Sequence, residues 1–252
     1  MNIKGKHVLV TGGGTGIGLA IAQTLAAAGA MVTIAGRRLD VLKNAADQGA
    51  GLFPLKMDVA LPDSVDEGIQ SAIAQRGPVQ ICVANAGIAE GRSLKNTDLE
   101  FWRTMMAINL DGAFLTIQAC LPGMLDAGWG RVIAISSIAG LRGLKGAPAY
   151  TASKHGLVGL VRGLAADLLS KPVTVNAICP GYVDTDIVAQ NLEKIMARTG
   201  KDEAAAMALM QDVNPHGRLI APQEVAECAL WLCQNGAASV TGQALQIAGG
   251  EV

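Results

Sequence analysis

The amino-acid sequence predicts an α/β fold in which a doubly wound parallel sheet of about seven strands carries helices on both faces. Apolar, strand-like runs alternate with helical stretches along almost all of the 252 residues, and strand–helix–strand units of this length form parallel sheets. Charged residues make up only 16% of the chain, against roughly 25% in an ordinary soluble domain. So little charge indicates strands buried on both faces, together with helix faces buried against other subunits.

The elements are expected in a regular order. The expected strands are HVLVT (7–11), MVTIA (31–35), LFPLKMD (52–58), VQICVAN (79–85), GRVIAISS (130–137), VTVNAIC (173–179) and QALQIAG (243–249). The expected helices cover about 17–28, 39–47, 63–75, 98–125, 150–169 and 222–234, and Gly236 is expected to cap the last. Right-handed crossovers between such strands give a doubly wound sheet. No linker, composition shift or repeat divides the chain, so we expect one domain over 1–252.

The stretch 184–219 interrupts this order. It holds two helical runs, DIVAQNLEKIMA and DEAAAMALMQDV, but no companion strand. Because it begins just after the end of a strand, it is placed to cover a ligand crevice, and we expect a substrate lid there. The alternative is a plain pair of surface helices.

Charge and residue usage exclude several functional classes. The net charge is −1 and no long basic run occurs, so neither nucleic acid nor an anionic membrane is an expected partner. An uncharged stretch runs from Val8 to Gly36, but glycines break it and its pattern changes from strand to helix to strand, which favours a cytoplasmic protein over a membrane span. The five cysteines are scattered and the three histidines lack ligand spacing, so we expect free thiols and no metal.

The segment VTGGGTGIG joins the first strand to the first helix. Glycines at Gly12, Gly16 and Gly18 allow a tight turn and a close backbone approach to a pyrophosphate, which the amino end of the following helix stabilises. A glycine-rich turn at this place is typical of a Rossmann-type sheet, although the spacing is TGxxxGxG and not GxGxxG.

The second strand ends in IAGRR. Gly36 stands where an acidic residue would bind the ribose hydroxyls of NAD, and Arg37 and Arg38 follow it. Arginine presents a planar fork to phosphate oxygens, so the pattern favours NADP(H), with NAD(H) possible. Alternatively, the two arginines are a solvated helix start, although positive charge at that end opposes the helix dipole.

Tyr150 and Lys154 lie one helical turn apart, a spacing that is common on exposed helices and by itself indicates no chemistry. The wider pattern adds to it. In chain order the sequence carries TGGGTGIG (11–18), MDV (57–59), ANAG (84–87), INLDGAF (108–114), ISSIAG (135–140), YTASK (150–154) and CPGYVDT (179–185). With these motifs the chain resembles the short-chain dehydrogenase/reductase family over essentially its whole length. Ala84 departs from the Asn more usual in that family, which removes one polar contact.

The resemblance implies four catalytic residues. Tyr150 would exchange its phenolic proton with the carbonyl or alcohol oxygen, and Lys154, with the oxidised cofactor ring, would lower the pKa of that phenol from its ordinary value near ~10. Lys154 would also bind the nicotinamide ribose. Ser137 would hold the substrate oxygen, and Asn109 would anchor a water that relays protons to Lys154.

The resemblance also implies the cofactor contacts. Asp58 and Val59 would flank the adenine, and Asn85, Ala86 and Gly87 the adenosine ribose. Segment 180–185 would hold the carboxamide and phosphates. The expected cofactor-binding residues are thus Gly12, Thr15, Gly16, Ile17, Gly18, Arg37, Arg38, Asp58, Val59, Asn85, Ala86, Gly87, Tyr150, Lys154, Pro180, Gly181, Val183 and Thr185.

The substrate is less closely defined. The chain looks most like 3-oxoacyl and polyketide ketoreductases and 3-hydroxyacyl-CoA dehydrogenases. An apolar pocket is expected from Ile138, Leu141, Leu144, Tyr182, Ile187 and Val188. Arg92, Arg142 and Lys145 flank its mouth, either as a dock for a thioester's phosphate groups or as an ordinary solvated rim.

Three functions remain open. The first is an NADPH-dependent reductase of 3-oxoacyl thioesters or similar ketones. The second is a dehydrogenase that oxidises a secondary or cyclic alcohol, and the third is a non-catalytic NADP-binding sensor, against which the complete catalytic set argues. The helices at 98–125 and 150–169 are apolar on more than one face, so we expect a homotetramer, with a dimer as the alternative.

Overall fold

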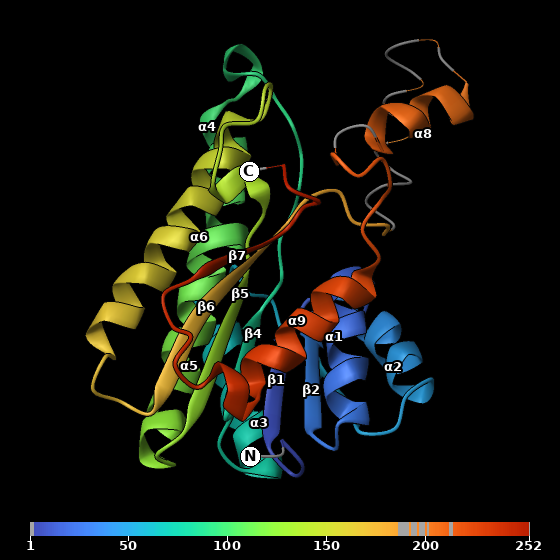
Figure 1. The fold of residues 1–252 in the computed structure, drawn as a ribbon. Coiled ribbons are helices and arrows are strands. Elements are labelled where there is room, and N and C mark those ends of the chain that lie inside the picture. Colours follow the sequence, from blue (N-terminus) through green and yellow to red (C-terminus); the bar gives the residue numbers. More distant parts are fainter. Residues whose placement is uncertain are drawn as a thin grey trace.

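The computed structural model describes residues 3–185, 192, 196, 200, 202–211 and 214–251. Its centre is a seven-stranded sheet in the order β3-β2-β1-β4-β5-β6-β7, and each neighbouring pair of strands is parallel (Figure 1). The strands are β1 His7–Thr11, β2 Met31–Gly36, β3 Leu52–Lys56, β4 Ile81–Ala84, β5 Gly130–Ile135, β6 Val173–Pro180 and β7 Ala244–Ile247. The predicted fold class is confirmed.

Helices connect the strands as expected from the sequence. They are α1 Gly16–Ala27, α2 Leu39–Asp47, α3 Pro62–Arg76, α4 Leu99–Met106, α5 Gly112–Asp126, α6 Pro148–Asp167, α8 Glu203–Gln211 and α9 Pro222–Cys233. The short helical turns are η1 Leu94–Asn96, η2 Ala107–Asp111, η3 Ile138–Gly140 and η4 Asn235–Ala237.

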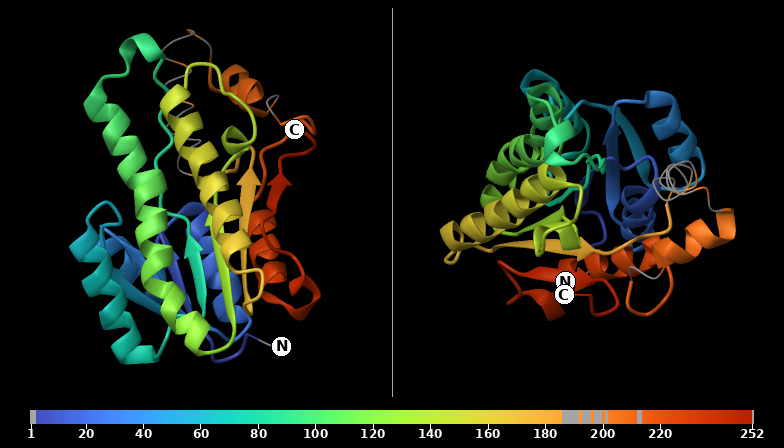
Figure 2. Two further views of the ribbon diagram at one scale, coloured as in Figure 1. Left: turned by 90° about the vertical axis from the view of Figure 1, so that its left-hand side faces the viewer. Right: turned by 90° about the horizontal axis from the view of Figure 1, so that it is seen from above.

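The sheet is covered on both faces, as Figure 2 shows. In β1, Val8 and Val10 pack into a core with α1, α2 and α9, whereas Leu9 packs into a second core with α3, α5 and α6. Successive strand side chains point to opposite faces, so a continuous apolar run is what a doubly covered strand requires. This arrangement accounts for much of the low charge content.

Two details of the helix prediction were wrong. The expected helix 98–125 is divided into α4 and α5 by the π-helical turn η2. Gly236 does not cap α9: the cap residue is Gln234, and Gly236 lies in η4 without a positive φ. A π turn adds a residue to the helical repeat and is invisible to a periodicity argument, but it often marks a functional site.

The interrupted stretch after β6 is closed at its base by an isolated parallel bridge between Val183 and Ile220. The second predicted helical run there corresponds to α8. Most of the first, DIVAQNLEKIMA, lies outside the described residues.

Residues Leu99–Asp126 form a helical stretch that is long and apolar enough to cross a membrane, judged by length and composition alone. Here it lies in the fold: α4 contacts α6, and α5 contacts α3, β4 and β5. All five cysteines are free, with Cys82 in β4 and Cys179 in β6.

Candidate active site

Two adjoining cavities of about 200 and 220 Å³ open at the carboxyl ends of the strands. They share Gly12, Thr15, Ala86, Gly87 and Ile88, so we treat them as the two halves of one cleft. The cleft lies where the sheet order changes direction, since β1 has β2 on one side and β4 on the other. Ligands bind at this switch point in open α/β sheets.

The glycine turn shapes the middle of the cleft. Gly12 and Gly16 have φ of +64° and +53°, which other residues rarely adopt. A Cβ on Gly18 would lie 2.3 Å from the Gly12 carbonyl oxygen and 2.4 Å from Asn85 Nδ2. The amide of Asn85 is close because it donates to the carbonyl of Thr11 at 2.9 Å. The turn is thus held against the end of β4, a contact that only a glycine at position 18 permits.

The amino end of α1 is an open anion site. Its N-cap, Thr15, makes no side-chain capping bond, and the first turn holds no acidic residue. Gly16, Ile17 and Gly18 of that turn line the cleft. Unpaired backbone N–H groups at a helix start attract phosphate oxygens, so this part of the chain fits the pyrophosphate of a dinucleotide.

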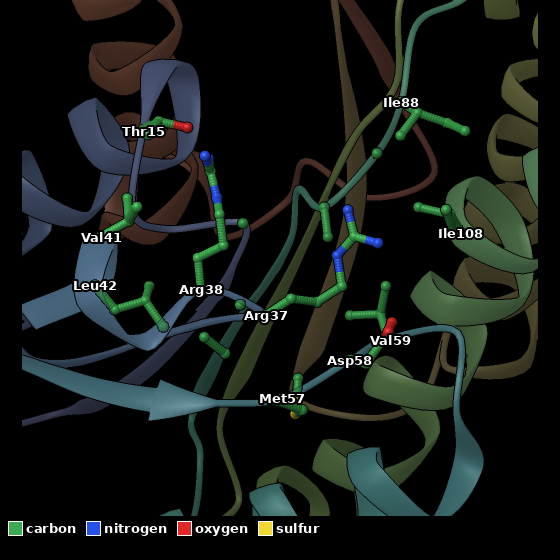
Figure 3. A pocket seen from close by; sticks show the side chains of 16 residues that line it. Thr15, Arg37, Arg38, Val41, Leu42, Met57, Asp58, Val59, Ile88 and Ile108 are labelled. Atoms are coloured by element: carbon green, nitrogen blue, oxygen red, sulfur yellow. The ribbon is translucent and has the colours of Figure 1, made fainter.

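One half of the cleft carries two cations (Figure 3). Arg37 and Arg38 follow β2, both are exposed and both line this half. The Arg38 side chain extends toward Thr15, and that of Arg37 extends toward the side formed by Val59 and Ile108. Gly36 carries no side chain at the end of β2, so the two guanidinium groups meet no carboxylate at that position.

Asp58 and Val59 line the same half, as predicted. The Asp58 carboxylate accepts a hydrogen bond from the Ala60 backbone N–H at 3.0 Å, which fixes the turn after β3. Sequence reasoning missed most of the apolar lining here. Those residues are Val41, Leu42, Met57, Ile88 and Ile108. Met57 and Ile108 lie in the MDV and INLDGAF motifs, and the other three lie in no motif.

The other half of the cleft contains Tyr150, from the first turn of α6. Its hydroxyl lies close enough to the Ser137 side chain to interact with it, and the Ser137 oxygen accepts the Ala139 N–H at 3.1 Å. In the chain alone, burial raises the pKa of Tyr150, and the neighbouring Ser137 side chain opposes that rise only in part. The expected lowering, which includes the charge of the oxidised cofactor ring, stays a prediction.

Lys154 is 5% exposed and lines the same half. Its Nζ donates to the backbone carbonyl of Ile135 at 2.9 Å and lies 5.9 Å from the centre of the Tyr150 ring. Burial lowers the pKa of Lys154 to about 8. At neutral pH the side chain therefore still carries its charge in most molecules.

Asn109 lies in the π turn η2 and is 1% exposed. Its side chain accepts the Ile88 N–H at 2.8 Å and donates to the Ile88 carbonyl at 3.0 Å. It also donates to Ser153 at 3.1 Å. A Cβ on Gly87 would lie 3.2 Å from Asn109 Oδ1 and 3.6 Å from Lys154 Nζ, so Gly87 leaves the space between the two side chains open.

The segment after β6 contributes one residue to the lining of the cleft. Thr185 lines the cleft, but Pro180, Gly181 and Val183 are not among its lining residues. Asn214, which the sequence did not suggest, is fully buried and holds this segment. It accepts the Tyr182 N–H at 3.0 Å and donates to the carbonyls of Tyr182 and Arg218 at 3.0 and 2.7 Å.

The predicted substrate residues are not all at a cavity. Ile138 is 1% exposed and belongs to the protein interior. Tyr182 is half-buried against α8 residues, and Leu144 is half-buried on the loop before α6. Ile187 and Val188 lie outside the described residues.

The three mouth cations differ in their surroundings. Arg92 contacts Glu90 at 3.0 Å and lies over the Phe101 ring at 4.0 Å. Arg142 forms an ion pair with Glu251. Lys145 is exposed, and no ion pair to it occurs within the part of the chain that the structure describes.

Comparison with known proteins gives a consistent result. Residues 6–196 match the family model described as short chain dehydrogenase. The chain is 37% identical to acetoacetyl-CoA reductase of Rhizobium meliloti (strain 1021) over 246 residues, which are 98% of each protein. It is 36% identical to the 3-oxoacyl-acyl-carrier-protein reductase FabG of Escherichia coli (strain K12) over 251 residues, covering 99% of this chain and 98% of that one.

A D-beta-hydroxybutyrate dehydrogenase of Rhizobium meliloti (strain 1021) is 34% identical over 252 residues, covering 97% of this chain and 98% of that one. Among solved structures, a variant of actinorhodin polyketide ketoreductase with NADPH superposes with a TM-score of 0.94 at 34% identity. That comparison covers 98% of this chain and 97% of the other.

Proposed function

This chain belongs to the short-chain dehydrogenase family and is an oxidoreductase of alcohol and carbonyl groups that uses a nicotinamide cofactor. From this premise we propose that it is an NADPH-dependent ketone reductase. The substrate we propose is a 3-oxoacyl thioester or a similar apolar ketone. The observation that carries the proposal is the position of Tyr150 beside the Ser137 side chain and the buried Lys154, in a cleft whose other half carries Arg37 and Arg38.

Arg37 and Arg38 support NADPH over NADH. A 2′-phosphate adds about two negative charges, and guanidinium groups bind phosphate oxygens in a bidentate manner. Without an acid at Gly36, nothing at that position repels the phosphate. The similarity to a polyketide ketoreductase solved with NADPH points the same way.

Tyr150 has the proton that the reductive direction requires. A phenol with an ordinary pKa near ~10 is protonated at neutral pH, and burial favours that neutral form further. Ser137 would hold the ketone oxygen with its hydroxyl, and Tyr150 would then protonate that oxygen. NADPH, when bound, supplies the hydride that the carbonyl carbon receives.

Lys154 would stabilise the tyrosinate left after proton transfer, because its ammonium charge lies one helical turn away. We also propose that it holds the nicotinamide ribose and that Asn109 orders a water for the return of the proton. The opening that Gly87 leaves between Asn109 and Lys154 supports such a path.

The thioester assignment rests on the relatives that reduce acetoacetyl-CoA and 3-oxoacyl carrier-protein substrates, by their names. The alternative, oxidation of a secondary alcohol, is favoured by the D-beta-hydroxybutyrate dehydrogenase relative. The two directions are chemically reversible, and the choice of cofactor separates them.

The proposal also covers the domain organisation, the assembly and the location of the protein. The chain would be one domain over 1–252 with a substrate lid over about 184–219, anchored at its base by the Val183–Ile220 bridge and by Asn214. It would assemble as a homotetramer, since Leu99, Trp102 and Phe114 are exposed on α4 and α5. It would be a cytoplasmic protein with no membrane or nucleic-acid partner.

The test is kcat/KM for acetoacetyl-CoA with NADPH and with NADH, together with identification of 3-hydroxybutyryl-CoA by mass spectrometry. We expect turnover and an NADPH preference of at least about tenfold. Turnover of a cyclic alcohol with NAD⁺, and none of the thioester with NADPH, would replace this proposal by the oxidative alternative.

A further inference from the structure

The segment after β7, Ala248–Glu251, packs beside Gly181, which follows the end of β6, and beside His216. A Cβ on Gly181 would lie 3.4 Å from the Ala248 Cα, and one on Gly249 would lie 2.5 Å from the His216 ring. Gly249 and Gly250 have φ of +62° and +88°, and the Glu251 N–H returns to the Ala248 carbonyl at 3.3 Å. This tight turn directs the Glu251 side chain inward, where it is 8% exposed.

Glu251 meets Arg142, which is carried by the loop between the two proposed catalytic residues Ser137 and Tyr150. The Arg142 N–H donates to the Ile138 carbonyl at 3.0 Å, so its backbone lies one turn from Ser137. The Arg142 side chain is 38% exposed and pairs through Nη2 with Glu251 Oε1. A carboxylate far along the chain therefore pairs with a cation on the loop that joins Ser137 to Tyr150.

The pairing is incomplete. Arg142 Nε and Glu251 Oε2 are both buried and have no hydrogen-bond partner within the described chain. A bidentate arginine–carboxylate contact would use both atoms. The arginine is therefore held by one charged contact, and its Nε–H remains without an acceptor. A carboxylate on a ligand can accept from this group if the Glu251 side chain moves away.

The loop has no other compensating charge. Residues 138–149 contain Arg142 and Lys145 and no Asp or Glu. With Glu251 removed, the loop that joins Ser137 to Tyr150 would carry two cations without a compensating charge. It would attract a short oxo acid, whose carboxylate lies a few bonds from its ketone. With Glu251 in place, that carboxylate meets a neutralised arginine and a fixed negative charge.

We propose that Glu251 is a specificity-determining residue that disfavours free 3-oxo acids and leaves the site open to neutral acyl chains. This inference rests on the proposed ketone reduction, and it deepens that proposal by separating thioester or ester substrates from free acids. On this proposal the chain's substrate is a thioester, like that named for the acetoacetyl-CoA reductase relative, and not a free acid, like that named for the D-beta-hydroxybutyrate dehydrogenase relative.

The experiment compares acetoacetate with ethyl acetoacetate, which shares its ketone but has no charge. In Glu251→Gln, kcat/KM for acetoacetate should rise about tenfold or more, chiefly through KM, because one charge-assisted contact is made available. The value for ethyl acetoacetate should stay within about twofold. In the double variant Glu251→Gln with Arg142→Met, the gain for acetoacetate should disappear.

An equal change for both substrates in Glu251→Gln, or a gain that survives Arg142→Met, would overturn the inference. Failure of the proposed function looks different, because wild type would then reduce neither ketone. In that event, isothermal titration of acetoacetate into the NADP⁺-loaded protein still tests the role of Glu251. Tighter binding in Glu251→Gln, lost again when Arg142→Met is added, supports that role. Unchanged binding refutes it. Melting temperatures of all variants show whether each one is folded.

Discussion

The ammonium group of Lys154 donates a 2.9 Å hydrogen bond to the carbonyl oxygen of Ile135, the last residue of β5. A strand end thus fixes a side chain from α6, and the lysine is buried beside Tyr150 without a carboxylate partner among the described residues. Burial penalises its charged form, which places its pKa at about 8.

A pH dependence follows from this value. Because a lowered pKa means that the proton leaves earlier, Lys154 is cationic below about pH 8 and neutral above it. We expect kcat/KM for NADPH, which reports the free enzyme, to fall above about pH 8. Since arginine keeps its charge, Lys154→Arg should move this fall to higher pH. An unchanged midpoint in the variant would assign the titration to another group.

Arg37 and Arg38 should set the cofactor preference. Replacing either by Ala removes a charge-assisted contact worth about 1.5–3 kcal/mol, so KM for NADPH should rise by about tenfold or more while KM for NADH changes little. Lys43→Ala is the matched control, since Lys43 is an exposed cation of α2 outside the cleft lining. An equal rise of KM for both cofactors would show that the arginines do not bind the 2′-phosphate.

Gly18 should tolerate no side chain. The Cβ of an alanine there would lie 2.3 Å from the Gly12 carbonyl, a backbone atom that cannot move aside cheaply. We expect Gly18→Ala to lower the free energy of unfolding by about 1–3 kcal/mol and to abolish NADPH binding. Gly236→Ala, where no atom lies within 4 Å, should leave both within error. Urea unfolding and cofactor titration measure the two effects.

The exposed apolar face of α4 and α5 should form a subunit contact. Phe114 is 43% exposed, and a charge placed in a buried interface is costly. Light scattering after gel filtration should show a tetramer for wild type and smaller species for Phe114→Glu. Leu209→Glu is the control, because Leu209 is as exposed as Phe114, at 43%, but lies on α8. A wild-type monomer would refute the proposed assembly.

The sequence predicted the sheet and its helices because their signals are local. Strands covered on both faces give continuous apolar runs, and Leu39–Asp47 was placed to the residue. It could not show the π turn at Asn109, since one extra backbone residue leaves the apolar pattern of α4 and α5 intact. The raised pKa of Tyr150 was also out of reach, because it depends on burial by segments distant in the chain.

Motifs located the cleft more reliably than the substrate side. Gly12, Asn85 and Lys154 each lie in a short sequence motif, so they leave a recognisable pattern. Arg142 pairs with Glu251, which is 109 residues away in the sequence. Asn214 bonds to Tyr182, which is 32 residues away. Such pairings depend on the fold and leave no spacing in the sequence.

The central claim is that Tyr150 supplies the proton in ketone reduction, and Tyr150→Phe tests it most directly. The substitution removes only the phenolic hydroxyl, which lies beside the Ser137 side chain. With NADPH and acetoacetyl-CoA, we expect kcat to fall about 100- to 10,000-fold, while the dissociation constant for NADPH stays within about twofold. A variant that retains wild-type kcat would contradict the account, because the proton would then come from elsewhere.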